Sequence, residues 1–176
     1  GIKANQESDV MINGLDFFPT IMSWSGAEKP DNLKLDGLDI STLLATNPAD
    51  PQLVKKENGE VRNTIMHHFP NSYSMHSTLR IGDYKLIRNY KPEMPPFELY
   101  QLYDNGKRVD IEESKNLAKA MPEKVQEMNK QLQLKLEEMD ASFPFLNPHT
   151  MRKIPGKDQV CSVLDHGIDG NKAWVK

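Results

Sequence analysis

Three histidines, His67, His68 and His76, form a cluster of side chains that could do chemistry near neutral pH. His67 and His68 are adjacent, and adjacent residues of a regular strand point to opposite faces, so they could not both bind one metal ion. A histidine at a strand end, beside a loop, can instead contact an anionic or hydroxyl-bearing ligand. We predict such a contact for His68, with a structural histidine as the alternative, and no metal site.

The other reactive candidates lack the partners that catalysis needs. Cys161 has no basic neighbour in Cys-Ser-Val-Leu-Asp to favour the thiolate, so we interpret it as structural. The segment 104–106 begins like a calcium loop, but the carboxylates after it do not have EF-hand spacing, which indicates a solvated turn. We interpret Arg80, Lys85 and Arg88 as cations that cover a solvated face, with anion contact as the alternative.

Composition limits the class of protein. A chain of 176 residues suits one domain, or one domain with a tail. With 22 basic and 25 acidic residues the net charge is −3, which argues against nucleic acid as the main partner. Apolar runs fall short of the roughly 18–20 residues of a membrane span. The single cysteine excludes an internal disulfide. The chain opens at Gly1 without a signal or transit pattern, and we expect a fragment or a processed product.

Helical patterns precede a region of strands. We predict a helix over about 15–25, with Pro19 in its first turn, Gly26 as its C-terminal cap, and Phe17, Ile21 and Trp24 on one apolar face. A short helix follows at 41–45, with Ser41 as its cap. The rest of residues 26–60 is rich in turn-forming residues and is predicted to be loop.

From residue 61 the pattern changes to short strands joined by turns. The predicted strands cover residues 64–69, 78–81, 84–90 and 97–103. Gly82-Asp83 is a two-residue hairpin signal. Residues 104–120 are predicted to be a charged loop with one helical turn near 114–118.

A long helix is predicted over about 122–140, with Pro122 and Glu123 in its first turn. Its apolar stripe consists of Val125, Met128, Leu132, Leu136 and Met139. The fold class is therefore α+β: a four-stranded antiparallel sheet covered by a long C-terminal helix and preceded by a helical and loop segment. Residues 150–176 show no period and are predicted to be an irregular extension.

Several short motifs resemble those of the formylglycine-dependent sulfatases, in the same order. They are LDFFPTIM at 15–22, LDGLDISTLL at 35–44, HHFP at 67–70, LRIGDYKLI at 79–87, FELYQLYD at 97–104, NLA at 116–118 and NP at 147–148. The resemblance covers roughly residues 9–149. It implies that residues 1–60 are the tail end of the large α/β sulfatase domain and that residues 61–149 are the small C-terminal subdomain.

The resemblance also indicates what this chain lacks. The family's nucleophile lies in Cys/Ser-x-Pro/Ala-x-Arg and becomes formylglycine, but Cys161 has neither the Pro/Ala nor the Arg, and Leu146 replaces the Arg in the nearest match. The calcium ligands belong to the family's N-terminal domain. We therefore expect no catalytic and no metal-binding residues here, and an inactive isolated chain. Calcium and formylglycine are implied for the parent enzyme.

The resemblance further implies partners and a substrate contact. The strand end and loop after HHFP approach the pocket mouth in related enzymes, so the predicted substrate-binding residues are His68, Asn71, Tyr73 and His76. Asn71 replaces the second histidine that many relatives carry. The expected partners are the missing N-terminal catalytic domain and a sulfated carbohydrate or aryl substrate, without nucleic acid or membrane. An exposed apolar surface predicts self-association, and the implied compartment is periplasmic, extracellular or lysosomal.

Two other functions remain open at this point. A phosphodiesterase or phosphonate-ester hydrolase of the same superfamily would carry a similar C-terminal subdomain. A non-catalytic binding module built on this subdomain would be a stable monomer without an exposed apolar face.

Overall fold

A computed structural model describes residues 2–70, 75–91 and 93–143. The chain divides into two compact units, residues 1–65 and residues 66–176, and each unit is described by itself. The extension predicted at 150–176, Cys161 and the motif at 147–148 lie outside the described residues.

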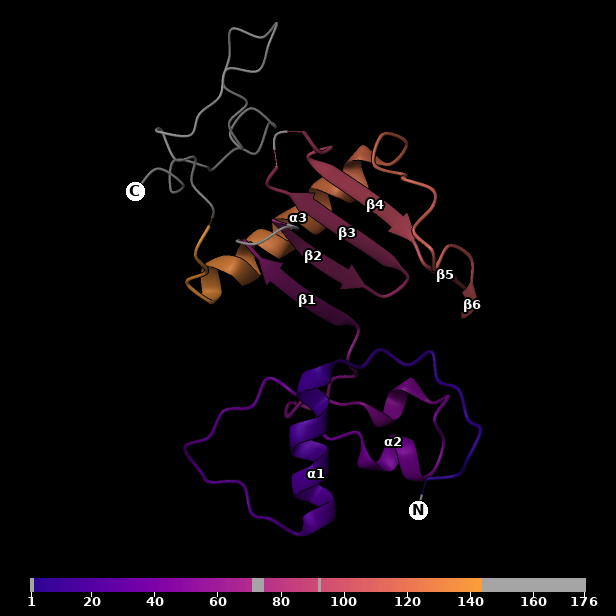
Figure 1. Cartoon of the computed structure of the whole chain (residues 1–176), viewed down its shortest axis with the longest axis vertical. Helices are drawn as coiled ribbons and strands as arrows, with labels where there is room; N and C mark the ends of the chain where they lie inside the picture. The colour runs from indigo at the N-terminus through magenta and orange to yellow at the C-terminus, as the bar shows by residue number, and fades with distance from the viewer. Residues whose placement is uncertain (1, 71–74, 92, 144–176) are drawn as a thin grey trace, which may run out of the picture. The chain divides into compact units, whose positions relative to one another are not determined.

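The first unit contains short helices connected by loops (Figure 1). A 3-10 turn, η1 (Gly14–Asp16), leads into α1 (Phe17–Ser25), and α2 (Ser41–Ala45) and η2 (Pro51–Leu53) follow. Gly26 ends α1 with a φ of +70°, a left-handed conformation that glycine adopts without strain. A small core forms around Ile40, Leu43 and Val54.

The second unit is a four-stranded sheet with one long helix, α3 (Pro122–Glu138), across one face (Figure 1). The strands are β1 (Thr64–Phe69), β2 (His76–Ile81), β3 (Tyr84–Asn89) and β4 (Phe97–Gln101), in the order β1-β2-β3-β4. In the antiparallel register Leu79 is opposite Leu86, and Leu86 is opposite Leu99. The predicted fold class, an antiparallel sheet covered by a C-terminal helix, is confirmed.

The core of the second unit forms where the leucines of the sheet meet the apolar stripe of α3. Val125, Met128, Leu132 and Leu136 are buried there. Pro122 occupies the first turn of α3, where a backbone N–H would have no intrahelical partner. The negative charge of Glu123 is stabilising there, because it lies at the positive end of the helix dipole. Met139 is exposed, contrary to prediction, because the helix ends at Glu138 and Met139 is already its C-cap.

Two local predictions about helices were wrong. Ser41 does not cap α2: Ile40 is the cap residue, and the Asp39 carboxylate accepts the Ser41 N–H instead. The helical turn expected near 114–118 is absent: residues 114–117 are irregular backbone, and the Asp110 carboxylate accepts the N–H groups of Ser114 and Lys115.

The strand expected at 97–103 is interrupted at Leu102. There the backbone N–H of Leu102 donates to the Asp83 carbonyl in the turn between β2 and β3. The chain then forms a second, two-stranded sheet from β5 (Tyr103–Asp104) and β6 (Lys107–Arg108). Asn105 and Gly106 turn between them with positive φ, as the turn predicted at this place requires.

Truncating a buried side chain of α3 should destabilise the second unit strongly. We expect Leu132→Ala to lower the free energy of unfolding by about 2–5 kcal/mol, because Leu132 is completely buried and its loss leaves a cavity. Urea unfolding followed by circular dichroism measures the loss. Leu134→Ala is the matched control, since Leu134 lies on the same helix and is exposed. Equal losses for the two variants would contradict the packing described here.

Candidate functional site

His68 lies near the end of β1 and has a hydrogen-bond partner at each ring nitrogen. Nδ1 is 2.6 Å from the Ser77 hydroxyl on β2, and Nε2 is 2.7 Å from the carbonyl oxygen of Ser142, beyond the end of α3. Since a carbonyl can only accept, Nε2 carries the proton in the neutral ring, and Nδ1 accepts from Ser77. His68 therefore ties the segment after α3 to the sheet.

The hydrogen bonds continue from Ser77 into the interior. The Ser77 hydroxyl is also 2.6 Å from the Tyr90 hydroxyl, so that Tyr90 donates to Ser77 while Ser77 donates to His68. Burial raises the pKa of Tyr90, and the bond to Ser77 and the nearby Arg88 charge partly offset that rise. Burial also lowers the pKa of the Arg88 guanidinium, which lies 5.6 Å from the Tyr90 ring. We call His68, Ser77, Arg88 and Tyr90 the His68 cluster.

Aromatic packing fixes the His68 ring in this orientation. The Phe143 ring lies edge-on at 5.4 Å between centroids and the Tyr90 ring at 6.2 Å. The sequence indicated His68 but not Ser77, Tyr90 or Ser142 as its partners. Those pairings depend on the register between strands and on where the chain runs after α3, which no local pattern encodes.

The structure describes two of the four predicted substrate-binding residues, His68 and His76. Asn71 and Tyr73 lie outside the described residues. His76 begins β2 next to Ser77, and because successive strand residues alternate, it points to the face opposite His68. Their role in binding substrate remains a prediction. His67 is exposed, as expected for the neighbour of His68 on a strand.

The three cations expected to cover a solvated face have different environments. Arg80 donates to the Gly82 carbonyl and lies 4.8 Å from the Tyr103 ring. Lys85 forms an ion pair with Glu113 at 2.5 Å. Arg88 is completely buried, so the prediction was wrong for it. Its position in β3 is opposite Ser77 and Phe97, on the sheet face that α3 covers.

A buried ion pair connects the beginning and the end of the first unit. Arg62 forms two hydrogen bonds with the Asp16 carboxylate, at 2.5 and 2.7 Å. The same carboxylate accepts the backbone N–H groups of Asn13 and Leu38, at 2.7 and 2.9 Å. Burial alone would raise the pKa of Asp16, but these four hydrogen bonds and the Arg62 charge together hold it below its ordinary value.

Neighbouring residues of the two motifs add further contacts around this ion pair. The Thr20 hydroxyl donates to the Asp16 carbonyl at 2.6 Å and accepts the Ile40 N–H at 3.0 Å. A Cβ on Gly37 would lie 2.0 Å from the Leu15 carbonyl oxygen, so only glycine allows this approach of the two backbones. The motifs at 15–22 and 35–44 thus join two segments of chain. Arg62 carried no sequence signal.

Among the residues that the structure describes, no group of three His, Cys, Asp or Glu side chains could hold a metal ion. Within the same residues, no helix is both long and apolar enough to cross a membrane.

Comparison with known proteins identifies the family. The model of the family described as N-sulphoglucosamine sulphohydrolase, C-terminal, matches residues 1–142. Mouse (Mus musculus) arylsulfatase G is 33% identical over 89 residues, which cover 48% of this chain and 15% of that protein. The chain belongs to the N-sulphoglucosamine sulphohydrolase C-terminal family, and the resemblance to sulfatases is confirmed.

Two solved structures share the fold. BT4656, determined in complex with its substrate D-glucosamine-2-N,6-O-disulfate, has a TM-score of 0.56 and 23% identity, over 79% of this chain and 26% of its own. YidJ from Bacteroides fragilis, described as a sulfatase, has a TM-score of 0.53 and 20% identity, over 81% of this chain and 28% of its own. The chain thus spans between a seventh and a third of the length of these relatives.

Neutralising Asp16 should destabilise the first unit and reduce its sensitivity to acid. We expect Asp16→Asn to cost about 3–5 kcal/mol, because it leaves Arg62 as a buried charge without its counter-ion. The folded pKa lies below the ordinary value of 3.8, so the stabilisation is present above that pH and is lost as the pH falls through the folded pKa.

Urea unfolding between pH 7 and pH 2 tests both statements. The wild-type chain should lose stability more steeply on acidification than Asp16→Asn. Asp36→Asn removes an exposed carboxylate from the same unit and should behave like the wild type. A loss below about 1 kcal/mol for Asp16→Asn, with unchanged acid sensitivity, would show that the pair does not stabilise the fold.

Proposed function

We propose that this chain is the C-terminal portion of a sulfatase that hydrolyses sulfate esters of a carbohydrate or an aryl alcohol. The observation that carries the proposal is the family match over residues 1–142, supported by the shared fold of two longer proteins. One of them has a disulfated glucosamine as its substrate, which favours a sulfated sugar for the parent enzyme. The same membership supports a secreted or lysosomal parent.

The chain's contribution in this proposal is support for the fold and one wall of the substrate pocket. Hydrolysis requires the nucleophile, which becomes formylglycine, and calcium, both in an N-terminal catalytic domain. The described residues supply no metal site of their own. From the family match we infer that residues 1–60 complete the large domain and that the isolated chain is inactive.

An exposed apolar face supports a missing partner. Phe17, Phe18, Ile21 and Trp24 on α1 are each more than half exposed, whereas Thr20 and the preceding Asp16 are buried. A solitary helix of a complete domain would bury its apolar side instead. We infer that this face packs against the N-terminal domain of the parent, and self-association of the isolated chain through it stays a prediction.

An activity assay on two lengths of the protein tests the proposal. The parent protein should contain Cys/Ser-x-Pro/Ala-x-Arg upstream of this segment and release sulfate from a chromogenic aryl sulfate or from a sulfated glucosamine. The 176-residue chain should not. Turnover by the chain alone would contradict the fragment proposal. Release of phosphate and not sulfate by the parent, with a threonine nucleophile, would favour the phosphodiesterase alternative.

The role of His68 in the pocket wall can be separated from its role in the fold. If a substrate oxygen replaces the Ser142 carbonyl at Nε2, then His68→Gln in the parent should raise KM about 5–10-fold and leave kcat within about twofold. His67→Gln is the matched control, because His67 is the exposed neighbour on the same strand. A fall in melting temperature with unchanged KM would show that His68 is structural only.

A further inference from the structure

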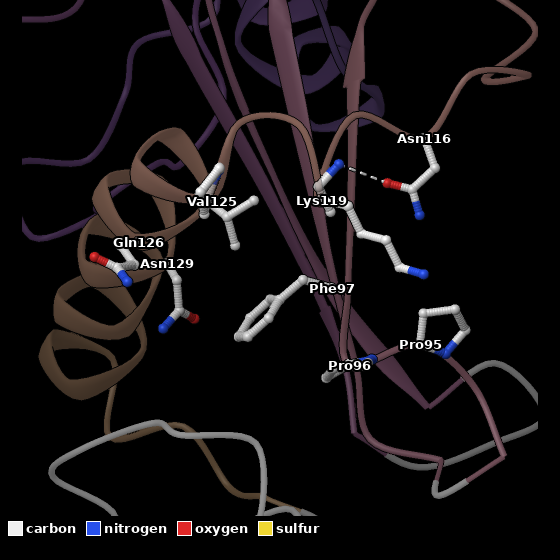
Figure 2. A pocket seen from close by; sticks show the side chains of 10 residues that line it. Pro95, Pro96, Phe97, Asn116, Lys119, Val125, Gln126 and Asn129 are labelled. Carbon is white, nitrogen blue, oxygen red and sulfur yellow. Dashed lines mark hydrogen bonds between the residues drawn. The ribbon is translucent and has the colours of Figure 1, made fainter.

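A cavity of about 680 Å3 opens between the start of β4, the segment before α3 and the first half of α3, all within the second unit (Figure 2). Its apolar lining includes Phe97 and Pro96, and its polar lining includes Asn116, Lys119 and Asn129. This volume is typical of sites for small ligands, which run from about 300 to 1,000 Å3.

Asn129 gives the cavity a polar group that needs a donor. Its Oδ1 atom is buried and has no hydrogen-bond partner among the described residues. A buried acceptor without a partner costs about 1–3 kcal/mol. Because Oδ1 has almost no accessible surface, binding would remove that cost by turning the Asn129 amide toward a hydroxyl or N–H of the ligand. In Figure 2 the Asn129 side chain lies across from the Phe97 ring, so a ligand could contact both.

The described lining of the cavity has a positively charged side chain and no negatively charged one. Lys119 is exposed at the cavity and forms no ion pair within the part of the chain that the structure describes. No carboxylate is among the described side chains that line the cavity. The carboxamide oxygen of Asn116 already accepts the N–H groups of Leu99 and Ala118, which leaves its NH2 group as a further donor. An anionic group on the ligand therefore has a cation to meet.

The edge of β4 is partly closed to one common kind of occupant. A peptide could add to this edge strand by backbone hydrogen bonds. However, the chain itself uses those groups: the Leu99 N–H donates to Asn116, and the Leu99 carbonyl accepts the Leu117 N–H at 2.7 Å. A compact ligand fits this arrangement better than an extended one.

We infer that this cavity binds a pyranose ring that carries an anionic substituent. The Phe97 ring and the prolines face the C–H surface of the sugar, the side-chain amides of Asn116 and Asn129 pair with its hydroxyls, and Lys119 pairs with the sulfate or carboxylate. This binding requires no hydrolysis, so it can be tested whether or not the parent is a sulfatase.

Ligand-observed NMR on the full chain tests the inference, with N-acetylglucosamine 6-sulfate and N-acetylglucosamine as probes. The sulfated sugar should bind with a Kd of the order of 1 mM, as expected for so small a ligand. Lys119→Met should weaken its binding about fivefold or more and leave the unsulfated sugar unaffected. Lys130→Met, which removes an exposed cation of α3 outside the cavity, should change neither.

Asn129→Leu separates binding from folding. Because Oδ1 has no partner among the described residues, this variant should keep or raise the melting temperature while it weakens both sugars about threefold or more. Three outcomes would overturn the inference: no binding of the sulfated sugar, equal losses in Lys119→Met and Lys130→Met, or a tetraglutamate peptide that binds more tightly than the sugar.

Discussion

The buried pair between Asp16 and Arg62 is the interaction on which the first unit depends. It joins residues 46 positions apart and uses all the acceptor capacity of one carboxylate, since two backbone N–H groups complete its hydrogen bonds. Such a pair is stabilising only when both charges are fully bonded, because each has lost its hydration. The small apolar core around Ile40 could not by itself hold so many loops in place.

The second unit is stabilised differently, by an apolar core with a polar cluster beside it. The stripe of α3 covers the leucines of the sheet, and beyond them the His68 cluster fills the same face. From Tyr90 through Ser77 and His68 to Ser142, each donor meets an acceptor, and the chain of hydrogen bonds runs from the buried Tyr90–Ser77 pair to the exposed Ser142 carbonyl. The cluster therefore fixes both the end of β1 and the exit of the chain from α3.

The inverted burial of α1 links this architecture to the proposed role. Thr20 and the N-cap residue Asp16 are buried, whereas the apolar side of the helix is exposed. In the function proposed above, this exposed face packs against the N-terminal domain of the parent, which agrees with a family described by the C-terminal part of a sulphohydrolase. The motif residues Asp16, Thr20 and Gly37 hold separate backbone segments of this unit together.

The sequence by itself determined the three helices, the four strands of the larger sheet and the family. The periodic stripe of α3, the alternation in the strands and the Gly82-Asp83 turn are local signals, because each reflects how neighbouring residues share a face or a dihedral preference. Arg62, the orphan Oδ1 of Asn129 and the partners of His68 had no such signal. Arg88 looked like a surface cation although α3 covers its face. Only the tertiary structure decided these, since burial and pairing across distant segments depend on which faces meet and not on the residues beside them.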